Sequence, residues 1–411
     1  MNIAPTIVFL IFFTQILIFF VDISQTISKL LFTIFIIMIF VIYSFQKKKF
    51  RSWSFRTLNQ NGAIFFIYYF FMILCGFSYG YNFEYVIVAT FLVVPIFTFL
   101  IIPKNINVNM ILKIVLYFAY ITLFLSFLEL FAWDKISFLH NYVIDSFGVD
   151  GTSRIYVDER LRLFGYFSNA VNNGLLLITG VVILIEHLFL KFRWITLISI
   201  ILFIVAIYFT YTRNNYLSLF FALLLWFYIF NKQVISSKKL IMFSVVFYFS
   251  IIAMAFYLAF IEGNGSFDMI AFSGESSIQS RVISWVMIFY NYFLVDVFSL
   301  HTLFGYGLVQ LSNGFEPEKT FWAIDNNLAM IYLTSGIIGV ILFFSWLISA
   351  INVLSFSYLN MDMKNRSHIR IIIVLLLTYF INGAMNASVI NILYLLPILI
   401  MLSKYTRKLS D

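Results

Sequence analysis

The sequence predicts an all-α, polytopic membrane protein. Hydrophobic side chains make up 63% of the residues and charged side chains only 11%, and apolar runs recur from Ile3 to Leu402. A water-soluble chain of this length needs far more polar surface. About 20 apolar residues in an α-helix cross roughly 30 Å of hydrocarbon, where a helix satisfies its own backbone polar groups. The many Phe and Ile side chains are therefore expected to face lipid or neighbouring helices.

Apolar runs between polar breaks predict about twelve transmembrane helices. In chain order they cover residues 3–21, 27–45, 62–80, 85–102, 110–132, 168–188, 195–212, 214–230, 240–261, 327–349, 369–386 and 389–402. The chain is thereby divided into N-terminal helices (1–132), an external segment (133–167), central helices (168–261), a large external loop (262–326), and C-terminal helices with a tail (327–411).

The lysines and arginines of the connecting segments fall mostly on one side of the predicted membrane. Eighteen of the 26 lie there, and the other eight are Lys29, Lys135, Arg154, Arg160, Arg162, Arg213, Arg281 and Lys319. Because short basic connections stay in the cytoplasm, both termini are predicted to be cytoplasmic. The net charge of +8 is then a topological bias and gives no indication of nucleic-acid binding. No basic stretch precedes the first apolar run, which is expected to be a retained helix and not a signal peptide.

Neither cysteine nor histidine indicates a metal site. Cys75 is the only cysteine, which excludes an intramolecular disulfide and a cysteine-based zinc cluster. The four histidines, His140, His187, His301 and His368, are widely separated.

Two external segments, 133–167 and 262–326, are long enough to hold a site. Residues 282–298 are apolar enough for a further span, but that span would turn the basic 352–370 loop outward. A helix lying in the outer interface is therefore predicted. A transporter places ionisable residues or broken helices near mid-membrane. Here carboxylates, arginines and asparagines gather outside the spans, which favours a reaction at the membrane surface.

Two arginines stand out in the external polar clusters. Arg213 lies in the polar break 210–215 between two apolar runs, and Arg281 opens the predicted interfacial helix, four residues before Trp285. Both could simply anchor the protein by reaching phospholipid head groups. A guanidinium also holds phosphate oxygens in a bidentate fork. The same residues therefore suit an anionic lipid-linked substrate.

Further clusters combine glycine, amide and carboxylate groups. Gly305 and Gly307 flank a tyrosine, Asp325 precedes Asn326, and Asn169 follows the aromatic stretch 164–167. A tight turn explains the glycines, and Asp325 suits a helix N-cap. Amides beside aromatic rings also suit carbohydrate, which needs hydrogen bonds and a stacking face.

In order and spacing, these clusters resemble the O-antigen polymerase and ligase superfamily, which includes the Wzy-type polymerases. The family pattern reads Gly-x-Phe-x-Asn and a Gly, then Ser/Thr-Arg, Arg-x-x-x-Trp, Gly-x-Gly, and His-Asn followed by Gly-x-x-Gly. The matching residues are Gly165, Phe167, Asn169, Gly174, Thr212, Arg213, Arg281, Trp285, Gly305, Gly307, Asn326, Gly336 and Gly339. The match covers residues 160–345. Two residues depart from the pattern: Asp325 stands where the family has histidine, and Ala170-Val171 stands where Pro-Asn is common. Because ligases typically keep the histidine, its replacement by Asp325 favours a polymerase over a ligase.

The resemblance implies a glycosyltransferase of the bacterial inner membrane. Its substrates would be oligosaccharide repeat units on undecaprenyl pyrophosphate, joined at the periplasmic face without a metal or other cofactor. A hydroxyl of one unit would attack the anomeric carbon of the other. Arg213 and Arg281 would stabilise the leaving pyrophosphate, and Asp325 would accept the proton.

The same resemblance implies a set of substrate-binding residues: Arg162, Asn169, Asn214, Trp285, Gly305, Gly307 and Asn326. Membrane lipids are expected partners, and a chain-length regulator protein is a candidate. Two alternatives stay open. One is an O-antigen ligase that transfers glycan to lipid A core, and the other is a flippase for lipid-linked oligosaccharides, which is no enzyme.

Overall fold

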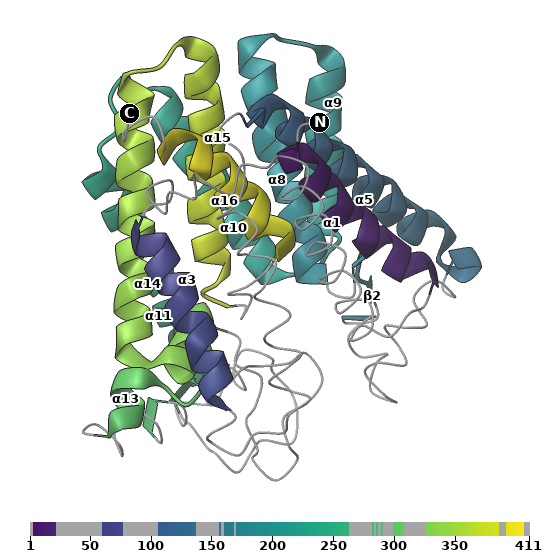
Figure 1. The fold of residues 1–411 in the computed structure, drawn as a ribbon. Coiled ribbons are helices and arrows are strands. Elements are labelled where there is room, and N and C mark those ends of the chain that lie inside the picture. Colours follow the sequence, from purple (N-terminus) through teal and green to yellow (C-terminus); the bar gives the residue numbers. More distant parts are fainter. Residues whose placement is uncertain are drawn as a thin grey trace.

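The structure is a computed structural model (Figure 1). It describes residues 3–21, 60–76, 106–136, 156–157, 160–167, 170–262, 282, 285–286, 289–290, 299–307, 326–385 and 392–406. In chain order the elements are α1 (Ile3–Val21), α3 (Gln60–Cys75), α5 (Val108–Ile136), β1 (Tyr156–Val157), β2 (Arg160–Leu161), α8 (Ala170–Leu190), α9 (Trp194–Tyr208), α10 (Arg213–Phe230), α11 (Ser237–Glu262), α13 (Leu300–Phe304), α14 (Asn327–Leu359), α15 (Met363–Asn382) and α16 (Ile392–Thr406).

The described part of the chain is almost entirely helical, as expected for a helical membrane protein. Four helices, α5, α8, α11 and α14, are long and apolar enough to cross a membrane. The other expected spans also coincide with described helices, except 27–45 and 85–102, which lie outside the described residues. The expected interfacial helix at 282–298 is described only at Val282, Trp285, Val286, Phe289 and Tyr290.

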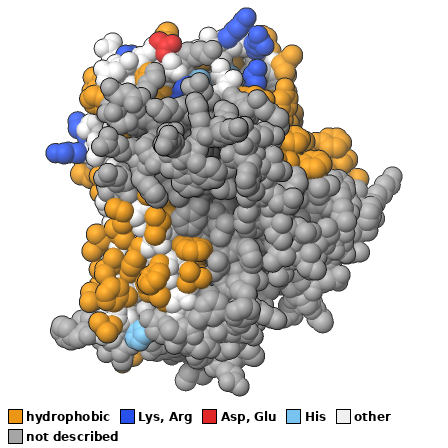
Figure 2. Space-filling model, in the orientation of Figure 1, with side chains coloured by type: hydrophobic (Ala, Val, Ile, Leu, Met, Phe, Trp, Pro, Cys, Tyr) orange, Lys and Arg blue, Asp and Glu red, His pale blue; other side chains and the backbone are white. Residues whose placement is uncertain are grey.

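The helices form one bundle in which α8 and α15 are central (Figure 1). α8 packs against α5, α9 and α10, α15 packs against α10, and α3 lies along α14. Many exposed side chains on α9 and α11 are apolar, such as Ile195 and Met242. Such apolar surface suits lipid, and the helices satisfy their own backbone polar groups there. In Figure 2, Lys and Arg gather towards the end where α14 is connected to α15.

The described helices also share a second end, here called the site end. There α8, α10 and α14 begin and α15 finishes. Hydrogen bonds join these termini to one another and to α5, whose Glu129 binds the segment before α8. The hairpin of β1 and β2 leads into this segment, with Val157 paired to Arg160. The sequence does not predict this hairpin, because two-residue strands carry no recognisable period.

The long helix α14 is broken inside its first third. Gly336 has φ 64° and ψ −166°, a conformation that ends a helix and that a residue with a side chain rarely adopts. The carbonyls before the break lose their intrahelical donors and need others. Tyr306 N–H donates to Leu333 O at 2.7 Å, Gly307 N–H donates to Thr334 O at 3.1 Å, and the Tyr68 hydroxyl donates to Ser335 O at 3.1 Å.

The Gly305-Tyr306-Gly307 stretch therefore supplies hydrogen-bond donors to the carbonyls that the break in α14 leaves without partners. A Cβ on Gly305 would lie 2.5 Å from Ser335 N, and one on Gly336 would lie 2.2 Å from Leu303 O. Both contacts are shorter than atoms tolerate, so the two backbones approach this closely only as glycines. The sequence predicts a turn at Gly305 and Gly307, and the structure shows what the turn does: it docks the chain after α13 onto α14.

Replacing Gly336 by alanine should destabilise the protein by at least about 2 kcal/mol. The new side chain would clash with Leu303 O and would strain the backbone at positive φ. The thermal unfolding midpoint of purified protein in detergent measures the effect. Ser250→Ala is the matched control, since among the described residues this exposed hydroxyl bonds Val246 O of its own helix. Equal midpoints for Gly336→Ala and wild type would contradict the close contact.

Candidate functional site

A tight turn between α9 and α10 brings two arginines together at the site end. Arg162 Nε donates to Thr210 O at 3.3 Å, and Arg162 Nη2 donates to Thr212 Oγ1 at 2.9 Å. Thr212 is the residue before Arg213, which begins α10. Leu163 N–H donates to Phe209 O and holds the two segments in register. The structure thus bonds Arg162 to the residue directly before Arg213, which lies 51 positions after Arg162 in the sequence.

Arg213 is exposed, and it contacts no carboxylate among the described residues. It stands at the N-terminus of an 18-residue helix, where backbone N–H groups favour an anion. The nearby Arg162 adds a second positive charge to the same turn. This arrangement is electrostatically favourable for a phosphate group brought from the membrane surface.

Tyrosine rings surround the arginine turn. The ring centroid of Tyr208 lies 6.0 Å from that of Tyr211 and 6.1 Å from that of Tyr216, and the Tyr216 hydroxyl donates to Tyr208 O. Tyr211 has φ 46°, the only positive value for a described residue other than glycine. Such a strained backbone is frequent at functional sites. The rings suit a membrane interface, and their faces equally suit a sugar ring.

Asn214 and Asn326 are both buried at the C-terminus of α15, with 3% and 5% of their surface exposed. Asn214 Nδ2 donates to Asn382 O at 2.8 Å, and Asn326 Nδ2 donates to Ala384 O at 2.9 Å. Asn327 N–H donates to the carbonyl between them, Gly383 O, at 2.8 Å. The last carbonyls of a helix have no intrahelical donor, so buried ones need a partner from outside the helix.

Asn326 is also the N-cap of α14. Its Oδ1 accepts from Ala329 N–H at 3.0 Å and from the Tyr248 hydroxyl at 3.1 Å. The cap therefore belongs to Asn326, and the neighbouring Asp325 lies outside the described residues. Asn326 itself is bonded to the end of α15, where Asn214 at the start of α10 is also bonded.

A buried carboxylate holds the segment that precedes α8. Glu129 Oε2 accepts from Phe164 N–H at 2.8 Å and from Gly165 N–H at 3.1 Å. Asn173 accepts from Thr122 at 2.8 Å and donates to Leu163 O at 3.0 Å. Gly165 is required here, because a Cβ would lie 2.1 Å from Thr122 Oγ1 and φ is 60°.

These contacts give the Gly165 region a structural role in placing Arg162. Glu129 is visible in the sequence only as a carboxylate near the end of an apolar run, which does not reveal its partner. Asn382, which connects Asn214 to Ser218 Oγ, has no motif that marks it in the sequence. Burial raises the pKa of Tyr166, in the same segment, well above its usual 10, so this phenol stays protonated.

The remaining predicted site residues are placed unequally. Gly305 and Gly307 dock the chain onto α14, and the Trp285 ring packs on Phe256 of α11 at a centroid distance of 6.2 Å. Arg281, Asn169 and Asp325 lie outside the described residues. The structure thus gathers Arg162, Arg213, Asn214 and Asn326 at the site end, and the roles proposed for them stay predictions. No protein-family model matches the chain, and no curated protein sequence matches it.

Proposed function

We propose that this protein is a surface-polysaccharide polymerase of the O-antigen type. It joins oligosaccharide repeat units that are carried on undecaprenyl pyrophosphate. The observation that best supports the proposal is the meeting of two segments at the end of α15: Asn214, next to Arg213, binds Asn382 O, and Asn326, next to Asp325, binds Ala384 O. Arg213, the proposed cation, and Asp325, the proposed base, each adjoin in the sequence an asparagine that binds the end of α15. The two carbonyls that these asparagines bind are two positions apart.

The proposed chemistry needs a cation and a proton acceptor close together. The leaving group is a pyrophosphate, so negative charge develops on its oxygens as the bond to the anomeric carbon breaks. Fixed guanidinium groups stabilise that charge, which is the role of Arg213 and Arg281, with Arg162 supporting them. The attacking hydroxyl loses its proton to Asp325. The reaction as proposed uses no metal.

The proposed topology has about twelve spans with both termini in the cytoplasm. The site end then faces the periplasm, together with segments 133–167 and 262–326 and the interfacial helix at 282–298. The described helices support this arrangement, because Lys191, Lys232 and Arg366 lie at helix ends opposite to Arg213. A lipid-linked substrate in the outer leaflet reaches the site end without crossing the membrane.

Topology reporters test the proposed orientation. A reporter fused after Lys238 or Lys364 should read cytoplasmic, and one fused after Gly151 or Gln310 should read periplasmic, because basic connections are retained inside. A cytoplasmic signal at Gln310 would remove the interfacial helix and turn residues 282–298 into a further span.

Deletion of the gene tests the function against its two alternatives. Lipopolysaccharide from a polymerase mutant should run on a gel as core plus one repeat unit, because single units are still ligated. Bare core would instead identify a ligase. Accumulation of carrier-linked units on the cytoplasmic face would identify a flippase.

A further inference from the structure

The apolar run 369–386 predicts a span, but α15 is not among the described helices that are long and apolar enough to cross a membrane by themselves. Its first half carries Lys364, Arg366, His368 and Arg370, and its uncharged apolar run extends only from Ile371 to Ile381. Eleven residues of helix span about 16 Å, roughly half of the hydrocarbon thickness. The helix is nevertheless central, and its side chains from Ser367 to Asn382 are buried by other helices.

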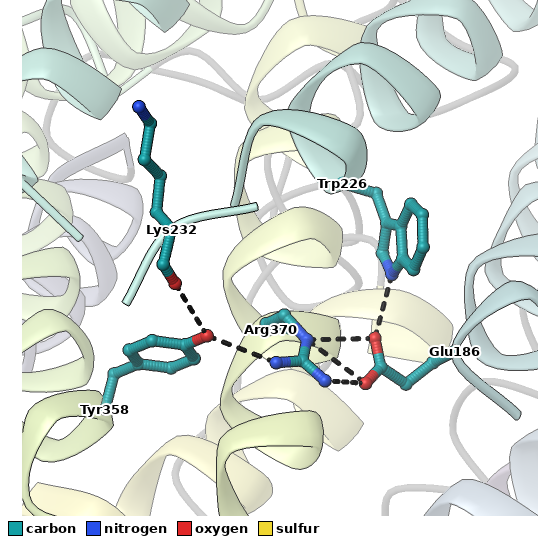
Figure 3. A network of polar contacts seen from close by, with 5 residues as sticks. All are labelled: Glu186, Trp226, Lys232, Tyr358 and Arg370. Atoms are coloured by element: carbon teal, nitrogen blue, oxygen red, sulfur yellow. Dashed lines mark hydrogen bonds and ion pairs between the residues drawn. The ribbon is translucent and has the colours of Figure 1, made fainter. Parts of the chain in front are cut away.

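The charge of Arg370 is neutralised inside the bundle (Figure 3). Arg370 Nε lies 3.1 Å from both carboxylate oxygens of Glu186 on α8, and Arg370 Nη2 also donates to Glu186 Oε1. The side chain of Glu186 is 0% exposed and that of Arg370 is 9% exposed. The arginine therefore points to a partner on another helix and does not reach outward to head groups.

Neighbouring side chains satisfy the rest of the pair. Trp226 Nε1 on α10 donates to Glu186 Oε2 at 2.8 Å. Arg370 Nη1 donates to the Tyr358 hydroxyl of α14 at 3.1 Å, and this hydroxyl donates to Lys232 O at 3.2 Å. The guanidinium also lies 5.2 Å from the ring centroid of Phe230. One ion pair thus connects α15 with α8, α10 and α14.

The two partners of the ion pair depend on it unequally. α8 is among the four helices that are long and apolar enough to span a membrane, and α15 is not. Arginine stays charged in proteins, whereas α8 meets the length and composition of a span with Glu186 in its sequence. Loss of Arg370 thus leaves an insertable α8, while loss of the Glu186 charge leaves a charged α15.

We propose that Glu186 acts as an insertion lock: α15 crosses the membrane only when the Glu186 carboxylate neutralises Arg370. The lock is independent of the proposed polymerase activity. It also matters for the site end, because the last carbonyls of α15 hold Asn214 and Asn326 there. An α15 that fails to cross cannot bring those two asparagines together.

Cysteine labelling in the full-length protein tests the lock. In a Cys75→Ala background, Ser236→Cys marks the α10–α11 connection and Ser388→Cys marks the α15–α16 connection, each in a separate protein. A membrane-impermeant maleimide is applied to each face of sealed vesicles, and the labelled fraction is normalised to total protein. With Glu186 and Arg370 intact, positions 236 and 388 should react from opposite faces.

The lock predicts an asymmetric pattern among the variants. Glu186→Gln should lower the labelling of position 388 roughly tenfold when the maleimide is applied to the face opposite to position 236, because a charged arginine opposes insertion of α15. Arg370→Leu should label normally, and the double variant Glu186→Gln, Arg370→Leu should recover normal labelling. Glu129→Gln, which alters a buried carboxylate bonded to backbone N–H groups, is the matched control and should label as wild type.

Three outcomes would overturn the lock. The first is normal labelling of position 388 in Glu186→Gln. The second is an equal loss of this labelling in Glu186→Gln and Arg370→Leu, and the third is a double variant whose labelling does not recover. The last two are expected if the ion pair only stabilises the folded bundle. If Glu186→Gln is degraded, abundance decides instead: recovery by Arg370→Leu supports the lock, and no recovery contradicts it.

Discussion

Replacing Arg213 by alanine should lower polymerisation roughly 100-fold, the usual effect of removing one group that stabilises transition-state charge. Arg213→Lys should also impair the reaction, because an ammonium does not reproduce a bidentate fork on phosphate oxygens. Arg213 is exposed at the start of α10, directly after the turn to which Arg162 is bonded, so neither change removes a buried contact. The length distribution of the polysaccharide ladder measures the effect.

Arg193 provides a matched control for Arg213. It is an exposed arginine directly before helix α9, on the opposite end of the bundle, and Arg193→Lys should leave the ladder unchanged. Arg281→Lys should shorten the ladder as Arg213→Lys does. A full-length ladder from a protein with lysine at both 213 and 281 would contradict pyrophosphate binding by these arginines. They would then be interpreted as membrane anchors.

Asp325→Asn should reduce long chains to the single-repeat band. The change keeps the size of the side chain and removes its ability to accept a proton. Helix capping does not complicate the test, since the N-cap of α14 is Asn326, whose Oδ1 accepts from Ala329 N–H. The variant should therefore be as abundant as wild type while making no ladder. Asp325→His should retain some activity, because it restores the residue typical of the resembled family.

Asn326→Ala is the contrasting variant for Asp325→Asn. It removes the helix cap and leaves the buried Ala384 carbonyl unpaired, so folding stability should fall by about 2 kcal/mol. The amount of polysaccharide ladder that Asn326→Ala makes should fall in proportion to the amount of folded protein. An abundant Asp325→Asn protein that makes the full ladder would show that Asp325 is not the base.

The helices could be predicted from the sequence because each apolar run carries its own local signal. The run 168–188 predicts α8 closely, and the polar break 210–215 marks the turn before α10. The run 327–349 predicts the end of α14 less well. The helix continues to Leu359, through a stretch in which Asn352, Ser355 and Ser357 interrupt the apolar pattern. The break at Gly336 is visible in the sequence only as half of a Gly-x-x-Gly pattern.

The contacts of the candidate site could not be predicted, because they join residues that are far apart in the chain. Asn214 and Asn382 are separated by 168 positions, and Asn326 and Ala384 by 58. An asparagine between two apolar runs has the same sequence signal whether it caps a helix or binds a substrate. The direction of each side chain depends on how α10, α14 and α15 pack against one another. The sequence of a single apolar run does not reveal this packing.

Reconstitution tests the polymerase proposal most directly. Carrier-linked single repeat units, extracted from a strain that lacks this gene, would be mixed with the purified protein in lipid vesicles and separated on a gel. We expect carrier-linked products that increase by one repeat unit at a time, and none with Asp325→Asn. No elongation by the folded wild-type protein, or transfer only when lipid A core is added, would contradict the proposal.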